Sequence, residues 1–219
     1  MSAPQHSTDA PLASATPEFP GAPHAPGTAA AGDGLAEGPW RRGGGVVVIT
    51  GIQAAGKSTV AQALAERLPR SVHLRGDTFR RVIVRGQVPM SPDPDEDALA
   101  QLRLRYQLLA SCADRYAAAG FTVIAQDVVL GHHLADLTTW ITTRPLAVVV
   151  LAPRPDAVEE REAGRSKTAY GPDWSVAGLD AELRAHTPPI GLWLDTSGQT
   201  VEETVREVLD RAWSDGGIG

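Results

Sequence analysis

Residues 51–58 have the types and spacing of a phosphate-binding loop. They read GIQAAGKS, match the pattern G-x-x-x-x-G-K-[ST], follow the apolar run Val46–Thr50 and precede a helix-like stretch over 59–68. The two glycines permit a tight turn in which successive backbone N–H groups face inward, and the next helix N-terminus adds partial positive charge there. The segment predicts a site for a nucleoside triphosphate. The alternative is a plain glycine-rich turn with a helix cap.

The side chains that end this loop have distinct predicted roles. Lys57 is expected to reach the β- and γ-phosphates and to act in catalysis, while Ser58 is expected to hold Mg²⁺. The expected cofactors are therefore ATP and Mg²⁺. The predicted nucleotide contacts are Gly51, Ile52, Gln53, Ala54, Ala55, Gly56, Lys57, Ser58, Thr59 and Ser197.

Two aspartates directly follow predicted strands, at the edge of the sheet where α/β proteins bind ligands. Phosphoryl transfer requires a carboxylate that positions the metal and an oriented acceptor hydroxyl. We expect Asp77 to accept the hydroxyl proton, and Asp127 to contact Mg²⁺ through water or to orient substrate. The alternatives are a helix N-cap at Asp77 and a strand-end turn at Asp127.

Arginines near the fourth predicted strand are candidates for a lid. Arg161 and Arg165 are four residues apart, hence on one helical face, and could neutralise charge on the transferring group. A solvated surface helix with Glu–Arg pairs is the alternative. Arg103 or Arg105, on the long helix from residue 97, is a candidate for acceptor binding.

Two further segments are weaker candidates. Ser197 lies in a loop where a nucleotide base could pack, although an Asx or Ser/Thr turn is equally consistent with its sequence. His132 and His133 could contact an acceptor, but a surface pair is the simpler interpretation.

The elements that must position these residues alternate between strands and helices, as in a parallel sheet covered on both faces. The longest helix, over 97–119, is expected to bury one stripe, and a capping box at Thr200 to Glu203 starts the last helix. The predicted strands are Val46–Thr50, 72–74, Thr122–Gln126, 147–151 and 191–194. The stripe consists of Leu99, Leu102, Tyr106, Leu109, Ala113 and Tyr116.

Composition limits the possible domain organisation, partners and location of the protein. Residues 1–40 hold seven of the 17 prolines and no Lys or Arg, which predicts a disordered Pro/Ala/Gly-rich tail before a domain over 41–219. The domain has 22 acidic and 20 basic residues, so bulk charge gives no support for a nucleic-acid partner. No run approaches the roughly 20 apolar residues of a membrane span, which makes the cytoplasm the expected location. The oligomeric state is left open, a homo-oligomer included.

With the phosphate loop, the two aspartates and the Arg-x-x-x-Arg segment in this order, residues 45–213 resemble small P-loop kinases, particularly the chloramphenicol phosphotransferase-like family. The resemblance implies a P-loop NTPase fold with a five-stranded parallel sheet in the order 2-3-1-4-5 and an Arg-containing lid. It also implies that Asp77 is the general base for a drug hydroxyl. The segment from Arg75 to Arg80 is similar to the aspartate-to-arginine segment of adenylylsulfate kinases, and gluconate and shikimate kinases share the plan.

The resulting hypothesis is an ATP-dependent O-phosphotransferase that acts on a hydroxyl of a small molecule, an antibiotic or nucleoside-type natural product. The alternatives are a metabolite kinase, a sugar-nucleotide or polynucleotide kinase, and a nucleotide-binding switch. An Asn-Lys-x-Asp segment for reading guanine is missing from the sequence, which disfavours the switch.

Overall fold

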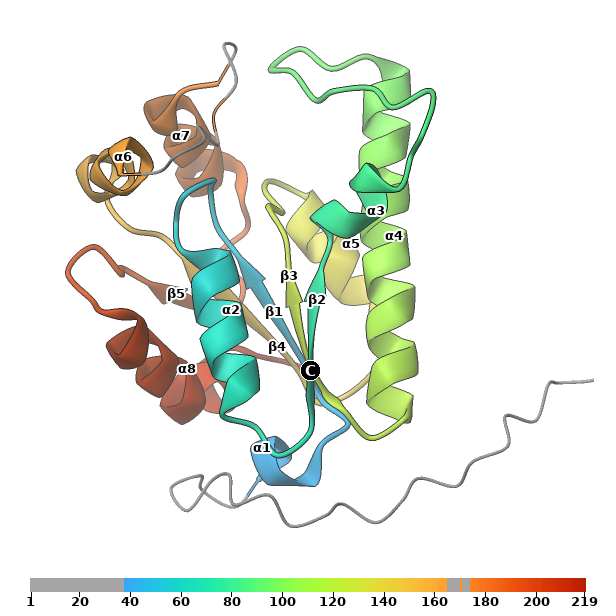
Figure 1. The fold of residues 1–219 in the computed structure, drawn as a ribbon, viewed down its shortest axis with the longest axis vertical. Coiled ribbons are helices and arrows are strands. Elements are labelled where there is room, and N and C mark those ends of the chain that lie inside the picture. Colours follow the sequence, from blue (N-terminus) through green and yellow to red (C-terminus); the bar gives the residue numbers. More distant parts are fainter. Residues whose placement is uncertain (1–37, 165–169, 171–173) are drawn as a thin grey trace, which may run out of the picture.

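The computed structural model describes residues 38–164, 170 and 174–219. Six strands lie in this part of the chain and form one sheet (Figure 1). Five are parallel, in the order β2-β3-β1-β4-β5, as expected, and β6 pairs antiparallel with β4. The two-residue β6 is too short to produce an alternating pattern, so the prediction of five strands was one short. The strands are β1 Val46–Thr50, β2 Ser71–Arg75, β3 Thr122–Gln126, β4 Leu146–Leu151, β5 Leu192–Leu194 and β6 Gly217–Ile218.

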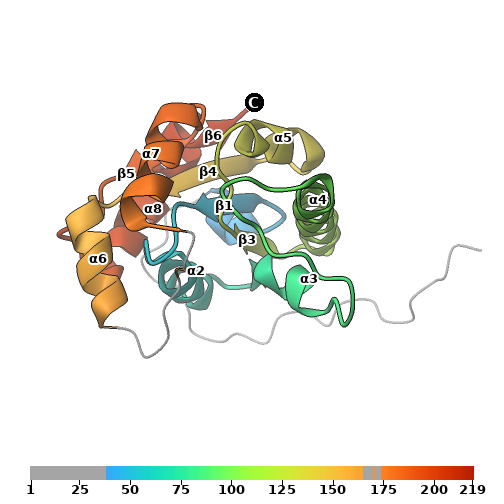
Figure 2. The ribbon, with the colours of Figure 1, turned by 90° about the horizontal axis from the view of Figure 1, so that it is seen from above.

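Helices cover both faces of the sheet, which confirms the expected layering (Figures 1 and 2). On one face, α2 packs against β1, β2 and β3 and against α8, and on the other face α4 packs against the same three strands and against α5. The helices are α1 Pro39–Arg42, α2 Lys57–Glu66, α3 Asp77–Arg81, α4 Glu96–Ala118, α5 His133–Trp140, α6 Pro155–Ala163, α7 Val176–His186 and α8 Val201–Asp215.

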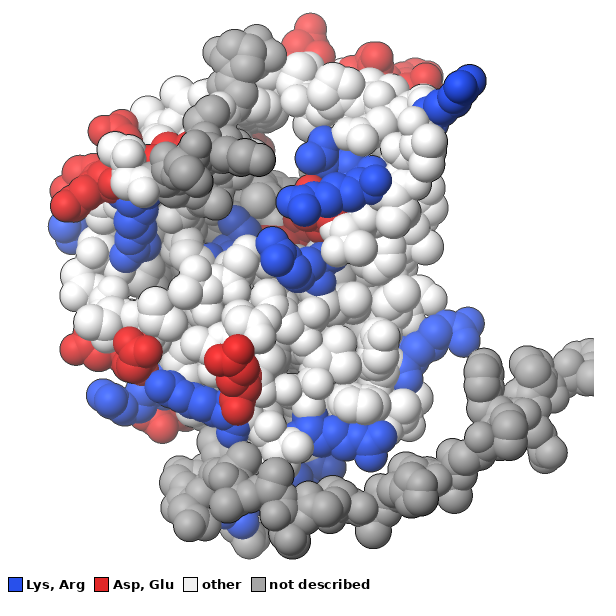
Figure 3. All heavy atoms as spheres, in the orientation of Figure 1, with Lys and Arg blue, Asp and Glu red and all other residues white. Residues whose placement is uncertain are grey.

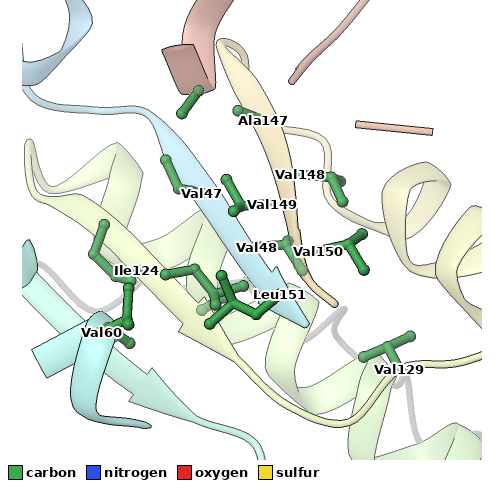
Figure 4. Close-up of a cluster of buried hydrophobic side chains, with 14 of the residues drawn as sticks. Val47, Val48, Val60, Ile124, Val129, Ala147, Val148, Val149, Val150 and Leu151 are labelled. Carbon is green, nitrogen blue, oxygen red and sulfur yellow. The ribbon is translucent and has the colours of Figure 1, made fainter. Parts of the chain in front are cut away.

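The core centres on the two middle strands, β1 and β4. Their side chains are buried throughout, and valines of β1 lie in one cluster with valines and Leu151 of β4, Ile124 of β3 and Val60 of α2 (Figure 4). Parallel strands covered on both faces require such continuous apolar runs. All five predicted strands match the parallel strands within a residue at each end, and β1, β3 and β4 were readable from their buried, largely apolar sequence.

The predicted stripe on α4 is buried only at its centre. Tyr106, Leu109 and Ala113 are buried, but Leu99 and Tyr116 are 40% and 43% exposed. A helix of this length extends about 35 Å, whereas a five-residue strand spans about 17 Å, so the sheet cannot cover the whole length of α4. Gly120, at φ +83°, follows the C-terminus of α4 as expected.

The boundary of the folded domain lies before residue 41. Trp40, assigned from composition to the tail, is 4% exposed, packs against Trp213 at 4.8 Å between ring centroids and donates from Nε1 to Leu209 O at 2.9 Å. Residues 1–37 lie outside the described part of the chain, so the predicted disorder of the tail stays a prediction. In the described residues, no helix is both long and apolar enough to cross a bilayer.

Candidate active site

The phosphate-binding loop connects β1 to α2, as its sequence predicted. Gly51 has φ +141°, and a Cβ there would lie 2.3 Å from Leu151 O, so the close approach of β4 requires glycine. Gly56 precedes α2 in the left-handed conformation. The loop thus joins a buried strand to a helix N-terminus, the arrangement in which backbone N–H groups bind phosphate.

Lys57, the first residue of α2, points back over this loop. Its side chain is buried, and Nζ donates to Ile52 O at 2.7 Å. A buried ammonium group beside a glycine-rich loop that leads into a helix N-terminus fits a polyphosphate. The predicted loop residues are therefore together, with Ile52 and Ala55 buried and Gln53 and Ala54 partly exposed.

The Ser58 hydroxyl, a predicted Mg²⁺ ligand, is held by an amide. Ser58 Oγ donates to Gln126 Oε1 at 3.0 Å, and this oxygen also lies 3.4 Å from His73 Nε2. The hydroxyl proton is thereby directed to Gln126, which leaves the oxygen lone pairs available to a hard cation. The residues present thus fit Mg²⁺ at Ser58. His73 and Ser58 line one open groove, of about 540 Å³, that also includes Arg75.

Asp127 follows Gln126 and is 1% exposed. Arg105 of α4 forms a two-point ion pair with it: Nε donates to Oδ2 at 2.6 Å and Nη2 donates to Oδ1. Oδ1 also accepts from Val128 N at 2.7 Å. Gly76 lies so close that a Cβ there would be 1.9 Å from Oδ2. The strand-end position was foreseen, but both oxygens are engaged by Arg105 of α4, and the expected Mg²⁺ contact stays a prediction.

Asp77 is the first residue of α3, whose N-cap is Gly76, so the N-cap alternative is wrong. Its side chain is 28% exposed and forms two ion pairs, with Arg80 Nε at 3.3 Å and with Arg81 Nε at 2.5 Å. Burial raises the pKa of the carboxyl, but the charges of Arg81, Arg80 and Arg105 outweigh burial and hold this pKa below its usual range. The Asp77 carboxyl group is therefore ionised at neutral pH and can accept a hydrogen bond.

Arg161 of α6 lies at the phosphate-binding loop. Its guanidinium donates to Ala55 O at 3.4 Å and to Thr196 O at 2.5 Å. The predicted partner Arg165 lies outside the described residues. From beyond α6, Tyr170 also reaches the loop, where its hydroxyl donates to Gln53 O at 2.8 Å. These contacts place Arg161 beside the phosphate-binding loop, while its catalytic role and the lid itself stay predictions.

The segment around Ser197 forms the polar turn that was the alternative to a base-binding loop. Asp195 Oδ1 accepts from Ser197 N at 2.9 Å and from Ser197 Oγ, and Arg154 N donates to Ser197 Oγ at 2.7 Å. Such a side-chain turn leads into the capping box of α8, which is present as expected. Contact between Ser197 and a nucleotide remains a prediction.

The acceptor-side candidates on α4 and α5 are near one another. Arg103 is exposed on α4, and its charge acts on His133, whose pKa is lowered by burial, by His132 and by Arg103. The rings of His132 and His133 lie 4.0 Å apart, and His133 packs on Tyr106. This pair is a partly exposed neighbour of Arg103, with no contact to the phosphate-binding loop among the described interactions.

Sequence reasoning missed Gln126 and the ion pairs of Asp77. The register of β3 could have revealed Gln126, because it pairs with Ile49, one residue before the end of β1. Arg80 and Arg81, three and four residues after Asp77, have the helical spacing of ion pairs. Arg105 was considered only for the acceptor pocket, and its pairing with a residue 22 positions away has no local signature.

Several similar solved structures are kinases. A sugar kinase from Janibacter sp. HTCC2649 is 23% identical, with a TM-score of 0.57, over 78% of this chain and 93% of that chain. A gluconokinase from Sinorhizobium meliloti 1021 is 25% identical, with a TM-score of 0.53, over 78% and 92%. The APS kinase of Mycobacterium tuberculosis in complex with AMPPNP and APS is 19% identical, with a TM-score of 0.55, over 78% and 97%. The chain thus has a P-loop kinase fold.

The sequence comparisons identify the family to which the chain belongs. A search of curated proteins found no match. Residues 46–189, well over half of the chain, match the AAA domain family AAA_33, and the matched range begins at β1 and contains the phosphate-binding loop, both aspartates and Arg161. On this match, the protein belongs to the AAA domain family.

Proposed function

We propose that the protein is a Mg²⁺- and ATP-dependent phosphotransferase that moves the γ-phosphate to a hydroxyl group of a small molecule. The observation that carries the proposal is the pairing of two features at the carboxyl edge of one sheet. One is the phosphate-binding loop with buried Lys57, and the other is the ionised, partly exposed carboxylate of Asp77. Ligands of open α/β sheets bind at this edge.

Each side chain has a role that follows from its position. Lys57 and the loop amides bind the triphosphate, Ser58 would hold Mg²⁺, and Arg161 adds positive charge beside the loop. When bound, the ion neutralises phosphate charge. Asp77 orients the hydroxyl, whose oxygen bonds to the γ-phosphorus as the bond to the β,γ-bridging oxygen breaks. ADP leaves with that electron pair, and the proton passes to Asp77.

The finer assignment of the acceptor rests on resemblance. The order of motifs, similar to that of chloramphenicol phosphotransferases, supports an antibiotic or nucleoside-type natural product as the alcohol. Structural likeness to a sugar kinase, a gluconokinase and an APS kinase supports small-molecule phosphorylation in general. We infer resistance by inactivation as the biological outcome only from the first resemblance.

Mass spectrometry tests this proposal directly. The protein is incubated with Mg²⁺, ATP and panels of hydroxylated small molecules, and the expected product is an acceptor that has gained one phosphate. Lys57→Ala should abolish product. Asp77→Asn should lower kcat by about 10²–10⁴-fold, the typical contribution of a positioned acid or base, while ATP still binds. Wild-type turnover by Asp77→Asn would show that the base is misassigned.

If the protein is a nucleotide-binding switch, the opposite result is expected in this experiment. A switch would hydrolyse ATP at a rate that no small hydroxylated compound changes, and it would form no phosphorylated acceptor. Hydrolysis measured in parallel with and without each panel therefore separates the two functions.

A further inference from the structure

The acceptor side of the site carries more positive charge than its carboxylates neutralise. Arg80 and Arg81 both bind the one carboxylate of Asp77, while Arg105 is already paired with Asp127. Three arginines thus face two aspartates, in a chain whose formal net charge is -6. Figure 3 shows basic side chains gathered around acidic atoms over α3.

The two ion pairs of Asp77 are exposed and therefore weak. The side chains of Arg80 and Arg81 are 45% and 69% exposed, and exposed ion pairs three or four residues apart add little stability to a helix. By contrast, the Arg105 side chain is 16% exposed and its pair with Asp127 is anchored by backbone contacts. The site therefore combines a fixed arginine with two that can change partner at small cost.

These same pairs occupy both oxygens of the carboxylate. Arg81 Nε at 2.5 Å and Arg80 Nε at 3.3 Å each engage one oxygen of Asp77, so a hydroxyl that is to be oriented would have to share an oxygen with a guanidinium group. An anion that bound the two guanidinium groups would release the carboxylate. Arginine is suited to this exchange because its planar fork binds carboxylate, phosphate and sulfate groups alike through two parallel hydrogen bonds.

We propose that the acceptor carries an anionic group besides its hydroxyl, and that this group draws Arg80 and Arg81 off Asp77 so that the carboxylate can engage the alcohol. The proposal rests on the proposed phosphotransferase function and names the substrate class of that site. A carboxylated, phosphorylated or sulfated alcohol fits the charge of this surface, whereas a neutral alcohol would leave Asp77 bound to its arginines.

Inorganic sulfate is the probe, titrated by calorimetry into protein saturated with Mg²⁺ and AMPPNP, so that the phosphate-binding loop is already filled. Sodium chloride at matched ionic strength is the blank. We expect saturable sulfate binding to the wild type and at least a tenfold loss of affinity in the Arg80→Gln/Arg81→Gln double variant. Arg85→Gln, which changes an exposed arginine of the same segment, should bind sulfate as the wild type does.

A second readout uses the wild type alone. Bound sulfate should raise the midpoint of the Asp77 carboxyl titration, followed by carbon NMR, because the arginine charges that lower it become neutralised. Acceptor pairs that differ only in a carboxylate against its neutral amide should then be phosphorylated at least tenfold faster in the charged form.

The outcomes separate this inference from the function on which it rests. No saturable sulfate binding, equal binding by the double variant, or equal rates for charged and neutral acceptors would overturn the anionic acceptor. If the double variant instead loses affinity for AMPPNP and sulfate does not bind, the arginines serve the γ-phosphate and the proposal fails. Sulfate binding requires no phosphoryl transfer. A lack of phosphorylated product in every panel would therefore contradict only the phosphotransferase function.

Discussion

The hydroxyl proposed to hold Mg²⁺ is oriented by a neutral side chain. Gln126 Oε1 lies 3.0 Å from Ser58 Oγ, and His73 lies on its other side, with Nδ1 2.8 Å from Gln62 Oε1. Without Gln126, the Ser58 hydroxyl could rotate away from the cation. A lost hydrogen bond costs about 1 kcal/mol, so we expect Gln126→Ala to weaken ATP binding in the presence of Mg²⁺ by about fivefold while metal-free ATP binding is unchanged. Calorimetric titrations with and without Mg²⁺ measure both affinities.

A matched control for this residue is Gln101→Ala. The Gln101 amide bonds only to the backbone at Gly86 and Val88 among the described contacts, so both affinities should be those of the wild type. If Gln126→Ala changes the two affinities by the same factor, Gln126 has no role specific to the metal.

At the scale of the elements, one carboxylate of α4 holds the segment that follows α5 through hydrogen bonds. Asp114 accepts from the backbone N–H groups of Thr142 and Thr143 and from the Thr142 hydroxyl, at 2.8–3.1 Å. Burial raises its pKa, but these hydrogen bonds outweigh burial and lower it. The bonds resemble an N-cap, whose loss costs about 0.5–2 kcal/mol. Urea unfolding should show a loss of this size in Asp114→Ala at pH 7.

The pH dependence of this effect has a defined sign. Because the folded pKa of Asp114 is depressed, its stabilisation is present above the unfolded value of about 3.9 and is lost as pH falls through the folded value. The difference in unfolding free energy between wild type and Asp114→Ala should shrink on acidification below that value. Asp210→Ala, at an exposed position on α8, serves as the control and should show no such trend. A difference that is constant with pH would contradict the role of the charge.

Across the whole molecule, the start and the end of the folded chain are packed together. Trp40 of α1 is buried against Trp213 of α8, and its indole N–H donates to Leu209 O. Truncation of a buried tryptophan to alanine costs about 3–5 kcal/mol, so Trp40→Ala should lower the unfolding free energy by that amount. Denaturant unfolding of this variant beside Arg42→Ala, an exposed neighbour on the same helix, measures the effect. Equal stability of the two variants would show that the folded domain does not need residue 40.

Features that depend on neighbours in sequence were determined by the sequence itself. The phosphate-binding loop was readable because the glycine positions, the lysine and the hydroxyl act through local backbone geometry. β1 and β3 were readable because strands buried on both faces must be apolar, and the capping box of α8 because its hydrogen bonds close within three residues.

Only the tertiary structure decided the pairings across the site. Asp127 was predicted beside Mg²⁺. Whether a carboxylate at the end of a strand binds a metal ion or an arginine depends on where α4 crosses β3, which no local pattern encodes. The same holds for Arg161 on Thr196 O, for Gln126 on Ser58 and for Trp40 on Trp213. Such contacts depend on how packed layers align, because helices that project past a short sheet carry their polar groups to partners far away in the chain.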